Sequence, residues 1–280
     1  MANMTDSTRP GGSGHAGSVP VTVLVKDGRS DGDRRRWQLA EEVPVNLAYN
    51  GRPHVVMMAT PRDLEDFARG FSLSEGVLAS SALIADIKVE EVEGGIMINL
   101  LTVPKAEVSE ERRARSLEGR TGCGICGMQK LEQVVRNVRP VAPGFNVDTE
   151  AIARAFRELP ERQVMNRDNR SLHAAAWCAA DGEIQIVRED VGRHTALDKL
   201  IGALAEARVD TAKGFVVMTS RCSFELVQKA SSVGIPCLAT VSAPTSLALD
   251  LARRAGMALA SLAGRDVVMF ETTEPAEAQP

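Results

Sequence analysis

The sequence lacks both a long apolar run and an excess of positive charge. None of its apolar segments approaches the ~20 residues that a membrane-spanning helix needs. The 280 residues carry a formal net charge of −4, which argues against binding nucleic acid or an anionic membrane through bulk electrostatics. Hydrophobic residues make up 44% of the chain and charged residues 25%, as in ordinary globular proteins. We therefore expect a folded protein that binds neither nucleic acid nor a membrane.

The N-terminal segment lacks the apolar core of a secretory signal. Residues 1–20 are polar and rich in Gly and Ser, which predicts a disordered tail. Arg34, Arg35 and Arg36 could suggest a twin-arginine signal, but no apolar segment follows them, and the pattern favours a solvated basic turn. The five cysteines are an odd number with no signal before them, which points to a reducing cytoplasm where thiols stay available.

A second C-x-x-C pair is also missing. Cys123 and Cys126 form the one such pair, and a tetrahedral zinc site would need further ligands from the scattered histidines or from Cys178, Cys222 and Cys237. No permanently bound metal is therefore expected. A thioredoxin-like dithiol would directly follow a strand of a βαβ unit, whereas an arginine-rich polar segment precedes this pair. Zinc binding and redox chemistry remain alternatives for the pair.

The residues around the pair favour a reactive thiol. Four glycines surround it, which leaves the sulfur atoms unshielded, and several arginines lead into it. Apolar residues at helical spacing follow from Met128 to Val138, so the pair should lie in a loop that leads into a helix N-terminus. Unpaired backbone N–H groups and nearby arginines favour the thiolate over the thiol. We interpret the pair as a presented, activated sulfur; the alternative is a glycine-rich turn with two incidental thiols.

Local signals divide the chain into two folded units. In the first, two hairpins should turn at Asn50-Gly51 and Gly94-Gly95, and a helix should begin at Thr60-Pro61, after a strand that starts at Val21. We expect a disordered tail at 1–20, a small α+β domain at 21–104, a Cys-bearing flexible loop and helix at 105–147, an α/β domain at 148–272 and a tail at 273–280.

Strands and helices alternate in the second unit. A hairpin that turns at Asp181-Gly182 comes first. Four expected strands then alternate with three expected helices; the strands are 215–219, 236–241, 257–262 and 267–270, and the helices are 195–207, 224–233 and 245–255. Because parallel neighbours need long crossover connections, this alternation predicts a largely parallel sheet covered by helices.

Polar loops follow three strands of this expected sheet, at 189–194, 220–223 and 242–246. Ligands of parallel α/β sheets bind beyond the carboxyl ends of the strands, where helix N-termini point at them. Since arginine forks and helix N-termini suit phosphate groups, we predict a phosphate-bearing ligand here. The candidate residues are Arg193, His194, Arg221 and Ser242. The alternative is that Ser and Thr residues only cap helices and the arginines pair with carboxylates.

Some polar residues of this unit have both functional and structural interpretations. His194 could be a general base or a hydrogen-bond donor to a ligand, and a structural role is an equal alternative. His173 and Trp177 lie on a predicted apolar strand, which favours the core. A lone cysteine such as Cys222 is most often a small packed apolar residue. Two further cysteines fall in predicted strands and should be buried: Cys178 and Cys237.

Four motifs occur in the order of a known family. They are the segment 63–76, Thr121-Gly-Cys-Gly-Ile-Cys-Gly127, Glu189-Asp-Val-Gly-Arg-His194 with Ala196-Leu-Asp-Lys199, and Ser242-Ala-Pro-Thr-Ser246. On these motifs, and over residues 21–270, the chain resembles the FdhD family of formate dehydrogenase accessory sulfurtransferases. The family usually has Asn where this chain has Thr195.

The resemblance implies a cytoplasmic, homodimeric sulfur carrier. Such a protein accepts sulfur from a cysteine desulfurase as a cysteine persulfide. It passes the sulfur to the molybdenum bis(molybdopterin guanine dinucleotide) cofactor, which formate dehydrogenase then uses. By motif, Cys123 matches the persulfide-bearing cysteine and Cys126 its partner. Two alternatives stay open: a molybdenum-cofactor chaperone that holds the guanine dinucleotide without transferring sulfur, and a zinc- or redox-responsive protein.

The resemblance also implies a fold and a binding segment. The family's C-terminal domain is similar to cytidine deaminases, so we expect a three-layer α/β/α domain. The zinc signature of those enzymes, H-x-E followed by P-C-x-x-C, is absent, because Ala174 and Ala175 follow His173. One further stretch aligns with a cofactor-contacting segment of the family: Leu262, Ala263, Gly264, Arg265, Asp266 and Val267.

Overall fold

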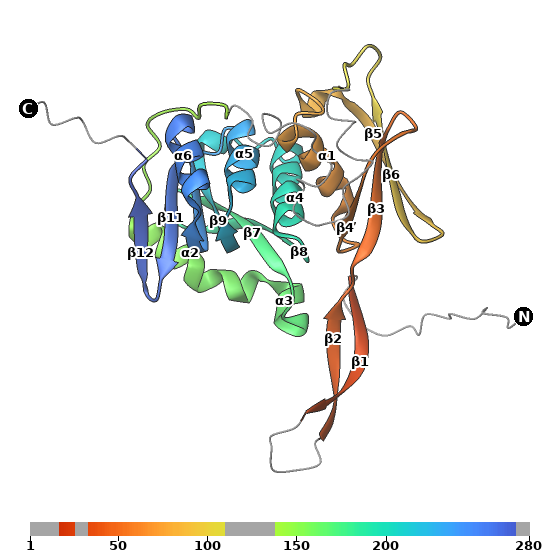
Figure 1. Ribbon diagram of the computed structural model, residues 1–280, viewed down its shortest axis with the longest axis horizontal. Helices are drawn as coiled ribbons and strands as arrows, with labels where there is room; N and C mark the ends of the chain where they lie inside the picture. The colour runs from red at the N-terminus through yellow and green to blue at the C-terminus, as the bar shows by residue number, and fades with distance from the viewer. Residues whose placement is uncertain (1–16, 26–32, 110–137, 273–280) are drawn as a thin grey trace, which may run out of the picture.

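The computed structural model describes residues 17–25, 33–109 and 138–272, which form two units and a projecting ribbon (Figure 1). The ribbon is the antiparallel pair of β1 (Ser18–Val25) and β2 (Asp33–Ala40). The expected basic turn is therefore wrong, because Arg34, Arg35 and Arg36 lie within β2. A run of three charged residues has no strand periodicity of its own, and the pairing with the valine-rich β1 defines this strand.

The N-terminal unit is a four-stranded sheet with one helix packed on it. The strands, in their order across the sheet, are β4 (Arg52–Ala59), β3 (Val43–Tyr49), β6 (Gly95–Thr102) and β5 (Ile84–Val92). Helix α1 (Leu64–Ser74) buries Phe67 against the sheet, and a 3₁₀ turn at Ser81–Leu83 precedes β5. Both predicted hairpins are confirmed: φ is 50° at Asn50 and 86° at Gly94, as tight turns of this kind require.

The C-terminal unit is a six-stranded sheet between two layers of helices, in the order β12-β11-β10-β9-β7-β8. Its strands are β7 (His173–Ala179), β8 (Ile184–Asp190), β9 (Gly214–Cys222), β10 (Cys237–Pro244), β11 (Ala258–Ala263) and β12 (Asp266–Phe270). Its helices are α2 (Thr149–Arg162), α3 (Val164–Asn169), α4 (Arg193–Glu206), α5 (Phe224–Ser232) and α6 (Ser246–Ala255), with a 3₁₀ turn at Thr211–Lys213. One apolar core lies under α4, α5 and α6, and a second lies under α2 on the opposite face (Figure 1). This confirms the α/β class with its three layers.

The large sheet is mixed, which corrects the expectation of a largely parallel sheet. β9, β10 and β11 are parallel neighbours, as their helical connections predict, but β7–β8, β7–β9 and β11–β12 are antiparallel pairs. Short turns join β7 to β8 and β11 to β12, and a short turn returns the chain antiparallel. Because β7 runs opposite to both of its neighbours, β8, β9, β10 and β11 all point in one direction. Their carboxyl ends therefore share one edge.

Helix α1 attaches the N-terminal unit to the C-terminal unit by packing against α4 (Figure 1). Gly70 of α1 faces the backbone of Asp198, and Gly202 of α4 faces the backbone of Asp66. A Cβ atom at either glycine would overlap a carbonyl oxygen of the other helix, so the absence of a side chain allows the approach. The two helices therefore pack backbone to backbone. In the described part of the chain, no helix is long and apolar enough to cross a membrane.

Candidate functional site

The predicted sulfur-bearing pair lies outside the described residues. Cys123 and Cys126, with the helix expected after them, fall within the segment 110–137. The geometry of the second predicted site, the polar edge of the large sheet, is described in full. The four candidate residues of that prediction lie near the carboxyl end of a strand or in the first turn of the helix that follows it: Arg193, His194, Arg221 and Ser242. The stretch 262–267, which the resemblance implies, spans the end of β11, a tight turn and the start of β12.

At the centre of this edge, β9 and β10 extend beyond the regular sheet. Arg221 of β9 is the register partner of Ser242 in β10, and both side chains are exposed. The register shifts twice in this extension, on either side of Ser242. The Thr240 hydroxyl donates a 2.7 Å hydrogen bond to the Ser242 carbonyl oxygen. This bond spans the first of the two register shifts. Such bulges reorient side chains and backbone groups, and they are frequent next to binding sites.

The stretch 262–267 forms the turn between β11 and β12, beside β10. Ala263 and Asp266 are register partners, and Gly264 between them has a φ of 68°, which favours glycine. Residues 263–266 are exposed. Because β11 is the parallel neighbour of β10, the turn lies at the same edge as Ser242. The structure thus brings this stretch next to the extension that carries Arg221.

Arg193 and His194 occupy the first turn of α4, and His194 faces the first turn of α5. The Nε2 atom of His194, a residue only 7% exposed, lies 4.0 Å from Oε2 of Glu225. In the described structure, three buried polar atoms of these two helix N-termini have no hydrogen-bond partner: Arg193 Nε, Ser223 Oγ and Glu225 Oε2. Unsatisfied buried polar atoms are rare in folded proteins, and a catalytic or binding role is one explanation for them.

Two helix N-termini open toward this cluster without side-chain caps. Gly192 is the N-cap of α4, and the hydroxyl of Ser223, the N-cap of α5, makes no capping hydrogen bond. The capping alternative is confirmed at Thr245 instead, whose hydroxyl accepts from the Ala248 N–H at 3.3 Å. Uncapped N–H groups and a guanidinium together provide what an anion needs.

His173 is a residue of this edge that the sequence analysis assigned to the core. It is the first residue of β7, half-buried, and the register partner of Asp190 at the end of β8. Burial lowers the pKa of His173, the nearby Arg193 guanidinium lowers it further, and Asp190 opposes both effects. A neutral imidazole therefore lies beside the candidate arginine. The sequence offered one signal for this placement: His173 lies at the start of its strand, and a residue at a strand end lies at the edge of the sheet.

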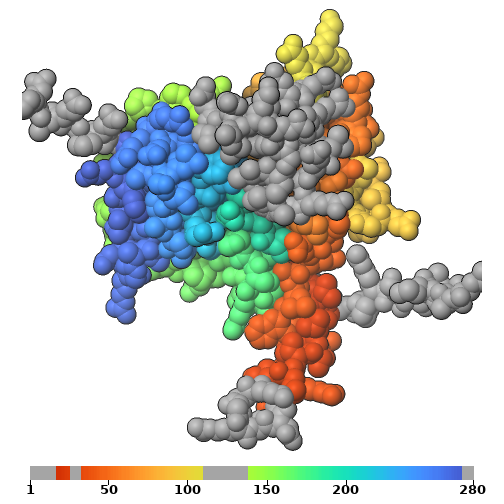
Figure 2. Space-filling model, viewed as in Figure 1, coloured from red at the N-terminus to blue at the C-terminus, as the bar shows by residue number. Residues whose placement is uncertain are grey.

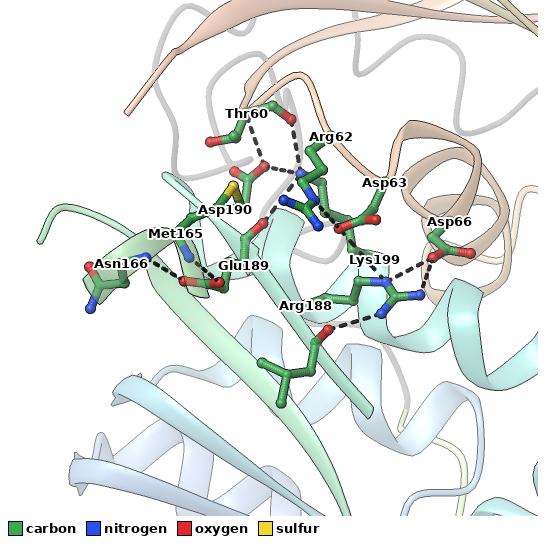
Figure 3. A network of polar contacts seen from close by, with 11 residues as sticks. Thr60, Arg62, Asp63, Asp66, Met165, Asn166, Arg188, Glu189, Asp190 and Lys199 are labelled. Carbon is green, nitrogen blue, oxygen red and sulfur yellow. Dashed lines mark hydrogen bonds and ion pairs between the residues drawn. The ribbon is translucent and has the colours of Figure 1, made fainter. Parts of the chain in front are cut away.

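The loop before Arg193 is held by a buried ionic network (Figure 3). Asp190 accepts hydrogen bonds from the backbone N–H groups of Thr60 (2.9 Å) and Gly192 (2.8 Å) and pairs with Lys199 at 2.7 Å. Lys199 also donates to the Thr60 carbonyl oxygen at 2.9 Å. The predicted helix start at Thr60-Pro61 is wrong for this reason: Thr60 bonds to the C-terminal unit, and α1 begins at Leu64.

Two neighbours of Asp190 extend the network into both units (Figure 3). Glu189 accepts from the N–H groups of Met165 (2.9 Å) and Asn166 (2.8 Å) in the first turn of α3. The guanidinium of Arg188 contacts the Asp66 carboxylate on α1 at 2.7 Å. The acidic half of the motif at 189–194 is thus structural, and it fixes the position of Arg193 and His194.

The three cysteines of the described structure are unsuited to nucleophilic chemistry. Cys178, Cys222 and Cys237 are all free and at most 1% exposed. Burial raises the pKa of each thiol to about 12, so each stays protonated at neutral pH. Among the described residues, no group of three or more His, Cys, Asp and Glu side chains gathers as a metal site would require.

This burial predicts a thiol count. In the native protein, a thiol-specific reagent should modify at most two cysteines between neutral pH and pH ~9, and all five after denaturation. Since the thiolate fraction of the buried cysteines stays small over this range, raising the pH should not add a third reactive site. Peptide mapping of the labelled native protein checks the result. Label on Cys222 at a rate similar to that of Cys123 would contradict it.

Comparison with known proteins places these features in a family. Residues 40–273 match the family model described as the FdhD/NarQ family. A protein of Chromobacterium violaceum named "Sulfur carrier protein FdhD" is 52% identical over 250 residues, covering 88% of this chain and 93% of that protein. One of the same name from Cupriavidus necator is 50% identical over 233 residues, covering 82% and 81%.

A solved structure shares the fold. It is titled as a putative formate dehydrogenase accessory protein from Desulfotalea psychrophila. The TM-score is 0.69 at 23% sequence identity, and the match covers 90% of this chain and 96% of that one. The arrangement of the units is therefore shared across a wide distance in sequence.

Proposed function

This chain belongs to the FdhD/NarQ family, and from that membership we propose that it is a sulfurtransferase that carries sulfur as a persulfide on Cys123. The donor would be a cysteine desulfurase, and the acceptor the molybdenum bis(molybdopterin guanine dinucleotide) cofactor of a formate dehydrogenase, in the cytoplasm. The names of its relatives, sulfur carrier protein and formate dehydrogenase accessory protein, support this proposal.

The observation that carries the assignment is the burial of the other cysteines. A sulfur carrier needs a thiolate that a partner can reach. Cys178, Cys222 and Cys237 are enclosed in the core and protonated, which rules them out as carriers in the native fold. The carrier would therefore be Cys123 or Cys126, and the family motif favours Cys123.

The proposed chemistry is thiol exchange in two steps. The Cys123 thiolate attacks the terminal sulfur of the desulfurase persulfide, a new S–S bond forms, and the desulfurase thiolate leaves. In the second step the Cys126 thiolate attacks Sγ of Cys123, forms a disulfide with it and releases hydrosulfide to the cofactor's molybdenum. The two electrons that convert sulfane sulfur to sulfide come from the two cysteines, and a thiol reductant then reopens the disulfide.

The polar edge of the large sheet would bind the phosphate groups of the cofactor's guanine dinucleotide arms. Arg193 and the N-termini of α4 and α5 offer buried donors, and Arg221 and Ser242 offer exposed ones. The turn at 262–267 continues the same edge. This arrangement supports binding of an anionic ligand, and the guanine identity rests on the family resemblance.

Arg193→Ala and Arg221→Ala should each weaken the binding of guanosine diphosphate about tenfold or more. A hydrogen bond to a charged group contributes about 1.5–3 kcal/mol, which corresponds to that range. Isothermal titration calorimetry on the full chain checks the values. Arg254→Ala is the matched control, since Arg254 is an exposed arginine on α6. Unchanged affinity in both site variants would place the nucleotide elsewhere.

Sulfur loading tests the central proposal. After incubation with a cysteine desulfurase and cysteine, intact mass spectrometry should show one added sulfur on the wild-type protein and on Cys222→Ser, which lacks a buried thiol. Cys123→Ser should gain none, because it has lost the acceptor. Loading of Cys123→Ser at the wild-type level would overturn the assignment. No loading on any protein, combined with nucleotide binding, would favour the chaperone alternative, and stoichiometric zinc would favour a metal protein.

A further inference from the structure

Two residues of α5 lie outside every motif that the sequence revealed, yet both pair with α4. Nε2 of His194 on α4 lies 4.0 Å from Oε2 of Glu225. One turn farther into both helices, Nζ of Lys229 contacts the two carboxylate oxygens of Asp198 at 2.8 and 2.9 Å. The two helices are thus joined at two levels, by a histidine and a carboxylate at the polar edge and by an ion pair below it.

The deeper ion pair holds the two helices at a fixed spacing. The Asp198 side chain is fully buried, and that of Lys229 is 7% exposed. The ammonium also contacts Glu75 Oε1 at 2.8 Å and Ser74 Oγ at 3.1 Å, both at the end of α1. Figure 1 shows α4 between α1 and α5, and in Figure 2 the teal atoms of this region lie in the middle of the molecule. Because these partners occupy the three donors of the ammonium, Lys229 does not neutralise Glu225 one turn above it.

Glu225 therefore places a negative charge beside a site that we propose to bind phosphate groups. Among the residues that the structure describes, no Lys or Arg nitrogen lies within 4.0 Å of its carboxylate, whereas the ring of His194 does. Like charges repel, so a carboxylate beside a neutral ring would weaken the binding of phosphate. A protonated ring attracts both the carboxylate and the phosphate, which removes this conflict.

The surroundings of His194 oppose its protonation until an anion binds. The residue is 7% exposed, and burial disfavours the charged form of a histidine. It also lies in the first turn of α4, directly after Arg193, where the helix dipole is positive. A phosphate group at the same helix N-terminus offsets both the dipole and the guanidinium. Binding of an anion and protonation of His194 should therefore favour each other.

We propose that this edge is proton-linked: when phosphate groups bind at the N-termini of α4 and α5, His194 takes up a proton, and Glu225 stabilises the imidazolium. Glu225 then acts through His194 and is a positioning residue. The inference rests on the proposed binding of phosphate groups at this edge. It predicts binding that is tighter at mildly acidic pH and weakens as the pH rises, because the linked proton is then less available.

Other charged and titratable groups surround this part of α4. They are Arg193 and Asp198 on α4 itself, Lys229 on α5, Glu75 on α1, Asp190 on β8 and His173 on β7. Asp190 is paired with Lys199. Burial raises the pKa of Asp198 to about 6, so this acid is ionised at pH ~7.5. At that pH, His173 is the alternative acceptor of the proton.

Isothermal titration calorimetry of the full chain, in buffers of different ionisation enthalpy, counts the protons taken up on binding. The ligand used is a guanosine diphosphate sugar, because a terminal phosphate would itself titrate with a pKa of ~6, whereas esterified phosphates keep their charge. At pH ~7.5 the wild type should take up about half a proton or more, and its Kd should rise about three- to tenfold per pH unit.

Substitutions identify the group that takes up the proton. Glu225→Gln keeps the size of the side chain and should lower the uptake at least about twofold, since the imidazolium loses its carboxylate. His194→Gln should abolish the uptake, and His173→Gln should still show it. Glu150→Gln is the matched control and should match the wild type, since Glu150 is an exposed acid in the first turn of α2, on the opposite face of the sheet.

Circular dichroism checks that each variant is folded. Equal uptake in the wild type and in folded Glu225→Gln would overturn the inference, and so would loss of the uptake in His173→Gln; the proposed ligand site would stand in both cases. A wild type that does not bind the sugar nucleotide would overturn that site and the inference together.

Discussion

Replacing Lys199 by methionine is expected to destabilise the protein by about 3–5 kcal/mol, because it leaves a buried carboxylate without its cation. Nζ of Lys199 lies 2.7 Å from Oδ2 of Asp190, and both side chains are fully buried. The ammonium also donates hydrogen bonds to backbone oxygens of Thr60 and Glu189, at 2.9 and 3.4 Å. Methionine occupies a similar volume, so the loss should come from the uncompensated charge and the unpaired acceptors rather than from a cavity.

The loss in free energy of unfolding caused by Lys199→Met should grow as the pH rises. Burial raises the pKa of Asp190, and the charge of Lys199 is the largest effect that opposes it. Without Lys199, the pKa of Asp190 in the folded protein should rise further above its unfolded value of ~3.9. An acid with a raised folded pKa holds its proton longer in the folded state than in the unfolded chain. Its stabilising contribution is therefore complete below pH ~4 and is lost as the pH rises through the folded pKa.

Urea unfolding at mildly acidic and mildly basic pH measures both effects. Lys213→Met is the matched control: Lys213 pairs with Asp210 at 3.2 Å, but its side chain is 80% exposed, so its loss should hardly change the unfolding midpoint. Adding Asp190→Asn to Lys199→Met should remove the pH-dependent part of the stability loss, since the carboxylate that Lys199 neutralised is then gone. A Lys199→Met protein as stable as the wild type would show that this buried ion pair and its hydrogen bonds to Thr60 contribute little to the stability of the fold.

The sequence predicted those elements whose causes are local. The turn at Asn50-Gly51 is confirmed because a two-residue hairpin needs left-handed backbone, which these two residue types adopt readily. Thr60 has an equally local signal for a helix start, yet its partners Asp190 and Lys199 lie 130 and 139 positions away. Tertiary hydrogen bonds of that kind override a cap, and no local pattern reveals them.

In the candidate site, too, the sequence predicted some residues correctly and missed those whose placement depends on tertiary contacts. Arg221 and Ser242 were placed at one sheet edge because the carboxyl ends of parallel strands must meet there, and their register pairing confirms this. The sequence analysis assigned His173 to the core because the apolar pattern around it predicts a buried strand. That pattern does not show that a residue at the end of the strand lies at the edge of the sheet. Glu225 was missed because an acid in a first helical turn is ordinary for the helix dipole. Its contact with His194 arises only when α4 and α5 come together.

Gly202→Ala should destabilise the protein by about 2 kcal/mol or more, although alanine is the better helix former. By propensity alone, the substitution inside a helix would stabilise by about 1 kcal/mol. In the structure, however, the new Cβ atom would overlap the carbonyl oxygen of Asp66 on α1. Overpacking of this kind typically costs about 1–3 kcal/mol, and here the obstacle is backbone that cannot rotate away. Gly70→Ala should behave alike, because its Cβ would meet the backbone of Asp198.

Whether Gly202→Ala lowers or raises the free energy of unfolding shows which effect dominates, the close packing of the two helices or the helix propensity of alanine. Ala205→Gly, one turn farther along α4, is the control, and it should cost about 1 kcal/mol through the backbone alone. If Gly202→Ala lowers the free energy of unfolding more than Ala205→Gly does, the close crossing of α1 and α4 determines stability. If Gly202→Ala instead raises it, the two helices do not pack backbone to backbone. The junction that positions Asp190, and through it Arg193 and His194, would then have to rest on the ion pairs alone.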